Sequence, residues 1–118
     1  MARAIYEIKL VENYFPATSA EDALEMQRNG HCSGILQDSE VTVAPVLGEE
    51  STIKLFLLAK TMYDMEKYTY QEVKSAVTAL CIQMGYYAQA EQLADTVITW
   101  VERFDDMPQS EFEEWLMG

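Results

Sequence analysis

The strongest constraint on the fold is a change of hydrophobic pattern near residue 51. Before it, residues 4–12 alternate between apolar and polar side chains, which is typical of a half-buried strand. After it, the strand patterns stop, and apolar side chains recur at helical spacing to the end of the chain. This order predicts an α+β fold. We expect a small two- or three-stranded N-terminal sheet packed on a helical C-terminal region of about four helices.

The N-terminal third also carries helix and turn signals. Thr18 and Glu21 have the spacing of a capping box, which predicts the start of a short helix ending near residue 30. Residues 34–36 and 40–46 predict a hairpin. Pro45 cannot donate a hydrogen bond to a neighbouring strand, so its strand is expected at an edge or at a late terminus.

The length of the chain indicates one domain with a real core. We expect residues 1–118 to form a single domain, with a strand, helix and hairpin part over 1–48 and a helical part over 49–118. Cys32 and Cys81 are the two cysteines, and each lies in an ordinary setting, so both are expected as reduced thiols in a cytoplasmic protein. The N-terminus lacks the apolar core of a signal peptide, and no stretch approaches the roughly 20 apolar residues of a membrane span.

Local signals divide the C-terminal part into helices. Residues 52–66 are apolar nearly all round the helical wheel, so this helix is expected at the centre of the core or under a partner. Thr69 and Glu72 form a second capping box and start a third helix. Gly85 suits a left-handed C-cap at its end. Pro108 ends the fourth helix and starts a short last one.

The junction between the third and fourth helices resembles the turn of a tetratricopeptide hairpin. Residues 85–90 read GYYAQA, with a small residue at the turn, an aromatic two positions later and alanine five positions later, and Leu93 and Val97 follow. The resemblance covers about 20 residues and one repeat, whereas a stable array needs about three. Lys74 stands where that family has a large aromatic side chain. The resemblance therefore implies a helical hairpin and carries over no peptide-binding groove.

The charge of the chain narrows the class of partner. Eight Lys and Arg stand against 20 Asp and Glu, which gives a net charge of −12, and residues 91–118 alone carry eight acids and one base. This excess argues against direct binding to nucleic acid or to an anionic membrane surface. A basic protein surface is the expected partner.

Five carboxylates lie on one side of the predicted fourth helix, interrupted only by Ile98. At about 100° per residue they fall within an arc of about 100°, opposite most of the apolar side chains. They are Glu91, Asp95, Glu102, Asp105 and Asp106. The first two repel each other at i,i+4, and the last two lie at the C-terminal end, where the helix dipole disfavours anions. Unfavourable local choices of this kind indicate a functional surface, so we expect these five residues to bind the partner.

The spacing of these acids is compared with that of DNA phosphates. Residues 91–106 span about 22 Å as a helix, which gives roughly one charge per 4–5 Å, against about 3.4 Å along one DNA strand. In composition the chain resembles the acidic phage and plasmid proteins that occupy the basic groove of restriction or CRISPR enzymes. Tyr68 and Tyr70 lie in a polar turn and are expected to contribute to binding, since tyrosine is enriched in interfaces. Tyr63 and Tyr87 are expected in the core.

The sequence favours a small acidic, non-enzymatic protein-binding module. It is expected to inhibit a nucleic-acid enzyme by occluding its basic surface or mimicking nucleic acid there, in the manner of phage or mobile-element anti-defence proteins. The alternative is a structural or assembly subunit that forms a homodimer through its apolar helix over residues 52–66, so the chain is expected as a monomer or a homodimer.

Enzymatic sites have little support in the sequence. His31 and Cys32 are adjacent, and neighbouring residues seldom point at one reacting atom, so an enzyme using them is the weakest reading. One histidine and two distant cysteines do not supply the ligands of a zinc site. Phosphate-binding glycine motifs are absent. We expect no catalytic residues, no metal and no cofactor.

Overall fold

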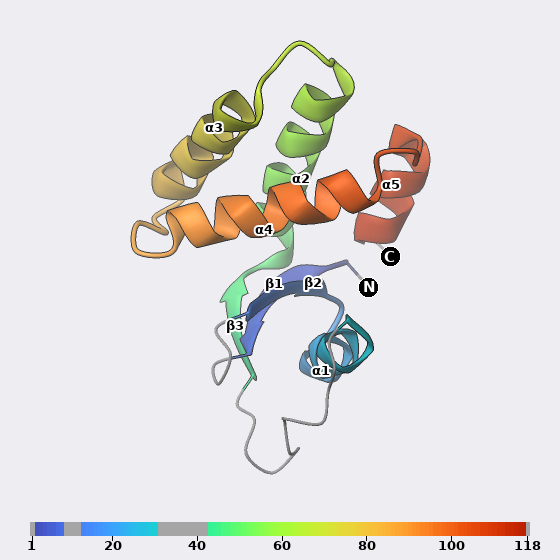
Figure 1. Cartoon of the computed structure of the whole chain (residues 1–118). Helices are drawn as coiled ribbons and strands as arrows, with labels where there is room; N and C mark the ends of the chain where they lie inside the picture. Colours follow the sequence, from blue (N-terminus) through green and yellow to red (C-terminus); the bar gives the residue numbers. More distant parts are fainter. Residues whose placement is uncertain (1, 9–12, 31–42, 118) are drawn as a thin grey trace. The chain divides into compact units, whose positions relative to one another are not determined.

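The computed structural model describes residues 2–8, 13–30 and 43–117 (Figure 1). The chain divides into two compact units, which are described separately below. Unit 1 is Met1–Thr52 with Met117–Gly118, and unit 2 is Ile53–Leu116. The division falls inside a helix, between Thr52 and Ile53. The predicted α+β class is confirmed, because an antiparallel sheet forms in the N-terminal part and helices make up the rest.

Unit 1 contains a three-stranded antiparallel sheet in the order β2-β1-β3. The strands are β1 (Ala4–Ile8), β2 (Asn13–Ala17) and β3 (Val43–Leu47). The single strand predicted over residues 4–12 is wrong in extent, because β1 ends at Ile8 and the chain forms a second strand from Asn13. Pro16 counts against a strand in the sequence, but β2 is an edge strand, where a missing N–H is tolerated.

The predicted hairpin is only partly within the described residues. The strand expected over 40–46 corresponds to β3, and residues 34–36 lie outside the described part of the chain. Among the described residues β3 pairs only with β1, which agrees with the expectation that Pro45 lies in an edge strand. Helix α1 (Ala20–Gly30) packs against the strands of this unit and ends where the sequence predicted (Figure 1).

The N-terminal cap of α1 differs from the prediction by one residue. The Ser19 hydroxyl accepts from the Asp22 N–H at 3.1 Å, and the Asp22 carboxylate accepts from the N–H of Thr18 at 3.0 Å. The predicted pair of Thr18 and Glu21 is therefore wrong. Ser19 and Asp22 have the same spacing, and Asp22 gains an additional partner in Arg3, at 3.6 Å.

Four helices follow, as predicted for the C-terminal part. They are α2 (Glu49–Asp64), α3 (Tyr70–Gln83), α4 (Ala90–Arg103) and α5 (Gln109–Met117). The capping box of Thr69 and Glu72 at the start of α3 is confirmed. Gly85 has φ 94° and follows α3, and the N–H of Tyr86 bonds the Cys81 carbonyl at 3.0 Å, which is the geometry of a Schellman cap. The helical hairpin is confirmed, because α3 and α4 pack against each other.

An aromatic cluster forms part of the core of unit 2, near the end of α4. Its members come from α2, α4 and α5, and they are Phe56, Trp100, Phe104, Phe112 and Trp115. The Phe104 and Trp115 ring centroids are 4.8 Å apart, and the two tryptophans stack with centroids 6.0 Å apart. Phe56 and Phe112 are fully buried. This cluster fixes α5 against the other helices of the unit.

Three of the apolar positions of helix α2 are buried, and the other five are partly exposed. Leu55, Phe56 and Ala59 are buried. The exposed large hydrophobic side chains of the described residues all lie outside this helix. This distribution agrees with the central position that the sequence predicted. Within the described residues, no helix combines the length and the apolar character needed to cross a membrane.

Lys60 is a fully buried lysine in α2 that the sequence did not single out. Its ammonium donates to the Phe104 carbonyl at 3.2 Å and pairs with Asp64 at 3.1 Å, and it lies 5.6 Å from the centroid of the Phe112 ring. Phe104 is the C-cap of α4, where the carbonyls lack partners inside the helix and the dipole favours a cation. Lys60 therefore serves as a side-chain cap for α4.

Candidate functional site

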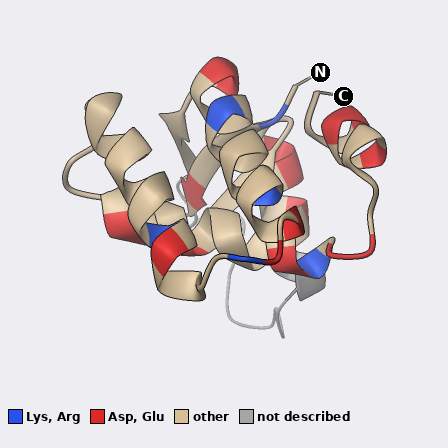
Figure 2. Ribbon diagram, turned by 90° about the horizontal axis from the view of Figure 1, so that it is seen from above, with Lys and Arg blue, Asp and Glu red and all other residues tan. Residues whose placement is uncertain are grey.

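Five of the seven residues predicted to bind a partner line one pocket in unit 2. The pocket has a volume of about 550 Å³. Its predicted members are Tyr68, Tyr70, Glu102, Asp105 and Asp106, and its other members are Tyr63, Asp64, Glu66, Val73 and Ile98. The wall thus combines three tyrosines and five carboxylates. Figure 2 shows how far acidic positions outnumber basic ones on the ribbon.

Asp105 and Asp106 reach this pocket from a turn and not from a helix. Helix α4 ends at Arg103, and Phe104 leaves the helical conformation at its C-cap. The five-residue helical stripe is therefore wrong at its last two positions. The physical reason is the Lys60 bond to the Phe104 carbonyl, together with the Met107 N–H, which bonds the same carbonyl at 3.0 Å.

Asp95 has partners on the neighbouring helix. Its carboxylate accepts from the Tyr70 hydroxyl at 2.6 Å and lies 3.2 Å from the Lys74 ammonium. The predicted repulsion at Asp95 is therefore offset by a cation on α3, which helical periodicity within one segment cannot detect. Ile98, expected to interrupt an exposed face, is only 2% exposed and lines the pocket.

Glu91 stands apart from the pocket. It is exposed in the first turn of α4, where the helix dipole favours an anion. The pocket lining does not include it. The predicted set thus divides into five pocket residues, one carboxylate paired across to α3 and one exposed helix-start acid.

Tyr63 was expected in the core, but the structure places it in the pocket wall. Partial burial raises the pKa of its phenol, and the negative charges of Asp105, Glu102, Asp64 and Asp106 raise it further. The fields of these carboxylates therefore converge on one side chain. In the sequence, the position of Tyr63 next to Asp64 at the end of its helix could have indicated that it lies near the surface.

Tyr87 is a second aromatic residue whose predicted position is wrong. It is 72% exposed in the turn between α3 and α4, although the sequence favoured the core. Tyr68 and Tyr70 are also exposed, which agrees with their predicted position at a surface.

Tyr70 is held in place by its bond to Asp95. This hydrogen bond, followed by partial burial and the charges of Asp95 and Glu102, raises the pKa of the Tyr70 phenol to about 12. The hydroxyl is therefore protonated at neutral pH and remains committed to Asp95. Its ring is fixed at the edge of the pocket as a result.

The Tyr70 bond predicts a late step in the alkaline titration of the protein. The folded pKa lies above the ordinary value of about 10, so the stabilisation by this bond is complete below pH ~10 and is lost as the pH rises through about 12. Ultraviolet absorbance of tyrosinate should include a contribution near pH 12, which Tyr70→Phe removes and Asp95→Asn shifts downward. Tyr87→Phe should leave the late step in place. A Tyr70→Phe titration with the late step unchanged would contradict the assignment.

Glu66 occupies a strained backbone position at the pocket. Its φ is 56°, in the left-handed region where glycine and asparagine are favoured and glutamate is uncommon. The turn that holds it bonds the Glu66 N–H to the Tyr63 carbonyl at 3.2 Å. The side chain that this strained residue contributes is a carboxylate in the pocket wall.

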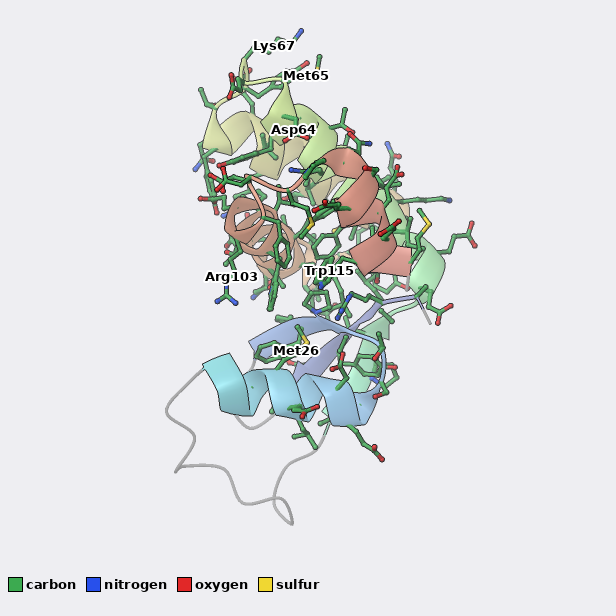
Figure 3. All side chains as sticks on the ribbon, turned by 90° about the vertical axis from the view of Figure 1, so that its right-hand side faces the viewer. Met26, Asp64, Met65, Lys67, Arg103 and Trp115 are labelled. Carbon is green, nitrogen blue, oxygen red and sulfur yellow. The ribbon has the colours of Figure 1, made fainter. Side chains whose placement is uncertain are left out.

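A cation of the chain itself lies on one pocket residue. The Lys67 ammonium is 5.3 Å from the centroid of the Tyr68 ring, within the distance of a cation–π contact. Figure 3 shows Lys67 projecting outward from the turn after α2, beyond Asp64 and Met65. The guanidinium carbon of Arg103 likewise lies 4.5 Å from the centroid of the Trp100 ring. The aromatic rings of this unit therefore already engage cationic side chains.

Metal ligands and nucleophiles are groups from which a reaction centre is commonly built. In the described part of the chain, no group of three or more His, Cys, Asp and Glu residues is arranged to hold a metal ion. Cys81 is a buried free thiol, and burial raises its pKa to about 11, which makes it a poor nucleophile. His31 and Cys32 lie outside the described residues.

The tetratricopeptide resemblance is limited to the α3–α4 hairpin. Lys74, which departs from that family's pattern, pairs with Asp95 at the helix interface. Comparison of the chain with models of protein families, with curated proteins and with solved structures found no match.

Proposed function

We propose that this protein is a non-enzymatic acidic binding module that engages a basic surface on a partner protein. The observation that carries the proposal is the pocket in which five carboxylates and three tyrosines meet. Tyrosine is enriched at protein interfaces, and uncompensated carboxylates attract basic partners and suppress anionic ones. The wider surface contributes through its net charge of −12, which accelerates encounter with a basic protein.

The partner class that fits best is a nucleic-acid enzyme with a basic groove. The module would either occlude this groove or mimic nucleic acid within it, as phage or mobile-element anti-defence inhibitors do. Glu91 and Glu102 are exposed on α4, and Asp105 and Asp106 are exposed in the turn that follows it. A groove that binds phosphates presents the arginine and lysine side chains that such a surface attracts.

The first test reverses two charges of the pocket. Asp105→Lys with Asp106→Lys is expected to lower capture of basic nucleic-acid-binding proteins from a cell lysate at least about tenfold, because close charge pairs across an interface contribute roughly 1.5–7 kcal/mol each. Capture by the unchanged protein should also weaken steeply as salt rises. The readout is quantitative mass spectrometry of the captured proteins, followed by measured affinity for the most enriched one.

The matched control reverses two exposed acids elsewhere. Glu25→Lys with Glu114→Lys changes the net charge by the same amount and should keep most of the affinity. Circular dichroism confirms that both variants fold. If the two double variants lose affinity equally, net charge alone drives binding, and the proposed site is wrong.

The alternative of a homodimer through residues 52–66 has less support. Within this segment Leu55, Phe56 and Ala59 are buried, and Met65 alone belongs to the exposed large hydrophobic side chains of the described residues. The proposal therefore rests on the acidic pocket, and light scattering over a range of protein concentrations tests the dimer directly.

A further inference from the structure

We propose that the pocket receives an arginine side chain of the basic partner. This inference rests on the function proposed above and deepens it by naming the group that is recognised. Its support is the combination of aromatic and acidic walls around one hollow of about 550 Å³. That volume lies within the ~300–1,000 Å³ of typical ligand sites, so an extended side chain has room to enter.

The tyrosines provide faces on which a planar cation can stack. Tyr63, Tyr68 and Tyr70 come from the end of α2, the following turn and the first residue of α3. Tyr70 has its hydroxyl bonded to Asp95, so that hydroxyl does not compete for the carboxylates of the pocket. Tyr68 already attracts the ammonium of Lys67 at 5.3 Å, which shows that its ring is placed to interact with a cation.

The carboxylates surround the hollow from separate segments. Asp64 and Glu66 lie on the α2 side, and Glu102, Asp105 and Asp106 lie on the α4 side. Among the described residues, Asp64 pairs with the Lys60 ammonium. The carboxylates of the other four have no ion pair or hydrogen bond with a cationic side chain of the described residues. Four carboxylates therefore remain to neutralise an incoming cation.

Arginine matches this arrangement better than other cations. A guanidinium is planar, carries five N–H donors along its edge and stacks through its faces, so it can bond carboxylates on two sides while lying on a tyrosine. A lysine ammonium is compact, strongly hydrated and has no planar face. A quaternary ammonium has no N–H and cannot donate to the carboxylates.

The backbone strain at Glu66 provides a way to separate a binding role from a structural one. Asparagine adopts the φ of 56° more readily than glutamate does, so Glu66→Asn should raise the denaturation midpoint. The same change removes a pocket carboxylate and should weaken arginine binding several-fold. A purely structural Glu66 would show a lower midpoint or unchanged binding.

The decisive experiment titrates the full chain with the peptide acetyl-Gly-Arg-Gly-amide, followed by ¹⁵N-NMR. Matched peptides carry lysine, trimethyllysine or the neutral isostere citrulline in place of arginine. The arginine peptide should give saturable shifts in the amides of the pocket residues and bind roughly fivefold or more tightly than the lysine peptide, because it can form bidentate bonds. The citrulline peptide should give no saturable shifts. Equal binding of arginine and lysine, tighter binding of trimethyllysine, or no saturable shifts would each overturn the inference.

Variants separate this inference from the proposed function. Glu102→Gln should weaken binding of the arginine peptide several-fold, whereas Glu25→Gln should leave it unchanged. If the arginine preference fails but the Asp105 and Asp106 reversal still abolishes partner capture, the binding function stands and only the arginine site is wrong. If the peptide binds as expected but capture is unaffected by the reversal, the proposed function is wrong.

Discussion

Replacing Phe112 by alanine is expected to lower the free energy of unfolding by about 3–5 kcal/mol. Phe112 is fully buried, and its ring centroid lies 6.1 Å from that of Phe56, 6.2 Å from that of Phe104 and 5.7 Å from that of Trp115. Its removal leaves a cavity at the point where α2, α4 and α5 meet. Because small domains have only about 5–15 kcal/mol of stability, this loss places the variant close to unfolding.

Urea unfolding followed by tryptophan fluorescence measures this effect. Phe112→Leu is the matched control, since it keeps most of the apolar volume and should lose much less stability than Phe112→Ala. A loss below about 1.5 kcal/mol for the alanine variant would show that the aromatic cluster does not hold the helices of this unit together.

The second large effect is expected at the buried lysine. Lys60→Met should lower the free energy of unfolding by about 2–3 kcal/mol, because hydrogen bonds to charged groups contribute roughly 1.5–3 kcal/mol and the Phe104 carbonyl loses its side-chain donor. Methionine retains the length and apolar stem of lysine, so the packing against Phe112 is largely kept. The measurement is again urea unfolding.

A second lysine of the same helix serves as the control for Lys60. Lys54 is exposed, and Lys54→Met should cost less than about 1 kcal/mol, as expected for a surface charge. An unchanged midpoint for Lys60→Met would mean that the cost of burying the ammonium cancels its bonds, as happens when some buried ion pairs are replaced. If the lysine holds the end of α4, the variant should also bind the arginine peptide less well, since Asp105 and Asp106 follow that end directly.

The helices could be predicted because their ends are determined by local chemistry. The capping box at Thr69 and the positive φ of Gly85 each depend on residues within one or two turns. The predicted end of the fourth helix at Pro108 is wrong, because α4 ends at Arg103, where Lys60 from another helix bonds the Phe104 carbonyl. The second strand could not be predicted from the sequence, because proline is unfavourable in a strand unless that strand lies at an edge. Whether the strand of Pro16 lies at an edge depends on the order of strands in the sheet, which is a tertiary property. At the start of α1, Thr18 and Ser19 offer equivalent cap spacings, and the partner that distinguishes them, Arg3, is distant in sequence.

The membership of the candidate site could be predicted in part, and its geometry could not. Tyr68, Tyr70, Glu102, Asp105 and Asp106 were identified from residue type and position, yet the helix that was to align the acids ends at Arg103. Tyr70 and Asp95 are separated by 25 positions, so their bond depends on how α3 and α4 pack. A helical wheel describes one segment and cannot show that a neighbouring helix supplies a partner. It also cannot show that a turn, a helix start and a helix end surround a common hollow.

The two prolines of the sheet have a consequence for how its outer strands can pair with a further chain. Pro16 lies in β2 and Pro45 in β3, which are the outer strands of the three-stranded sheet. An outer strand with a complete row of N–H groups is a template on which further chains can stack into fibrils. Each proline interrupts that row, because it has no N–H to offer. Within the described sheet, both outer strands therefore contain a residue that cannot donate a hydrogen bond to a further strand.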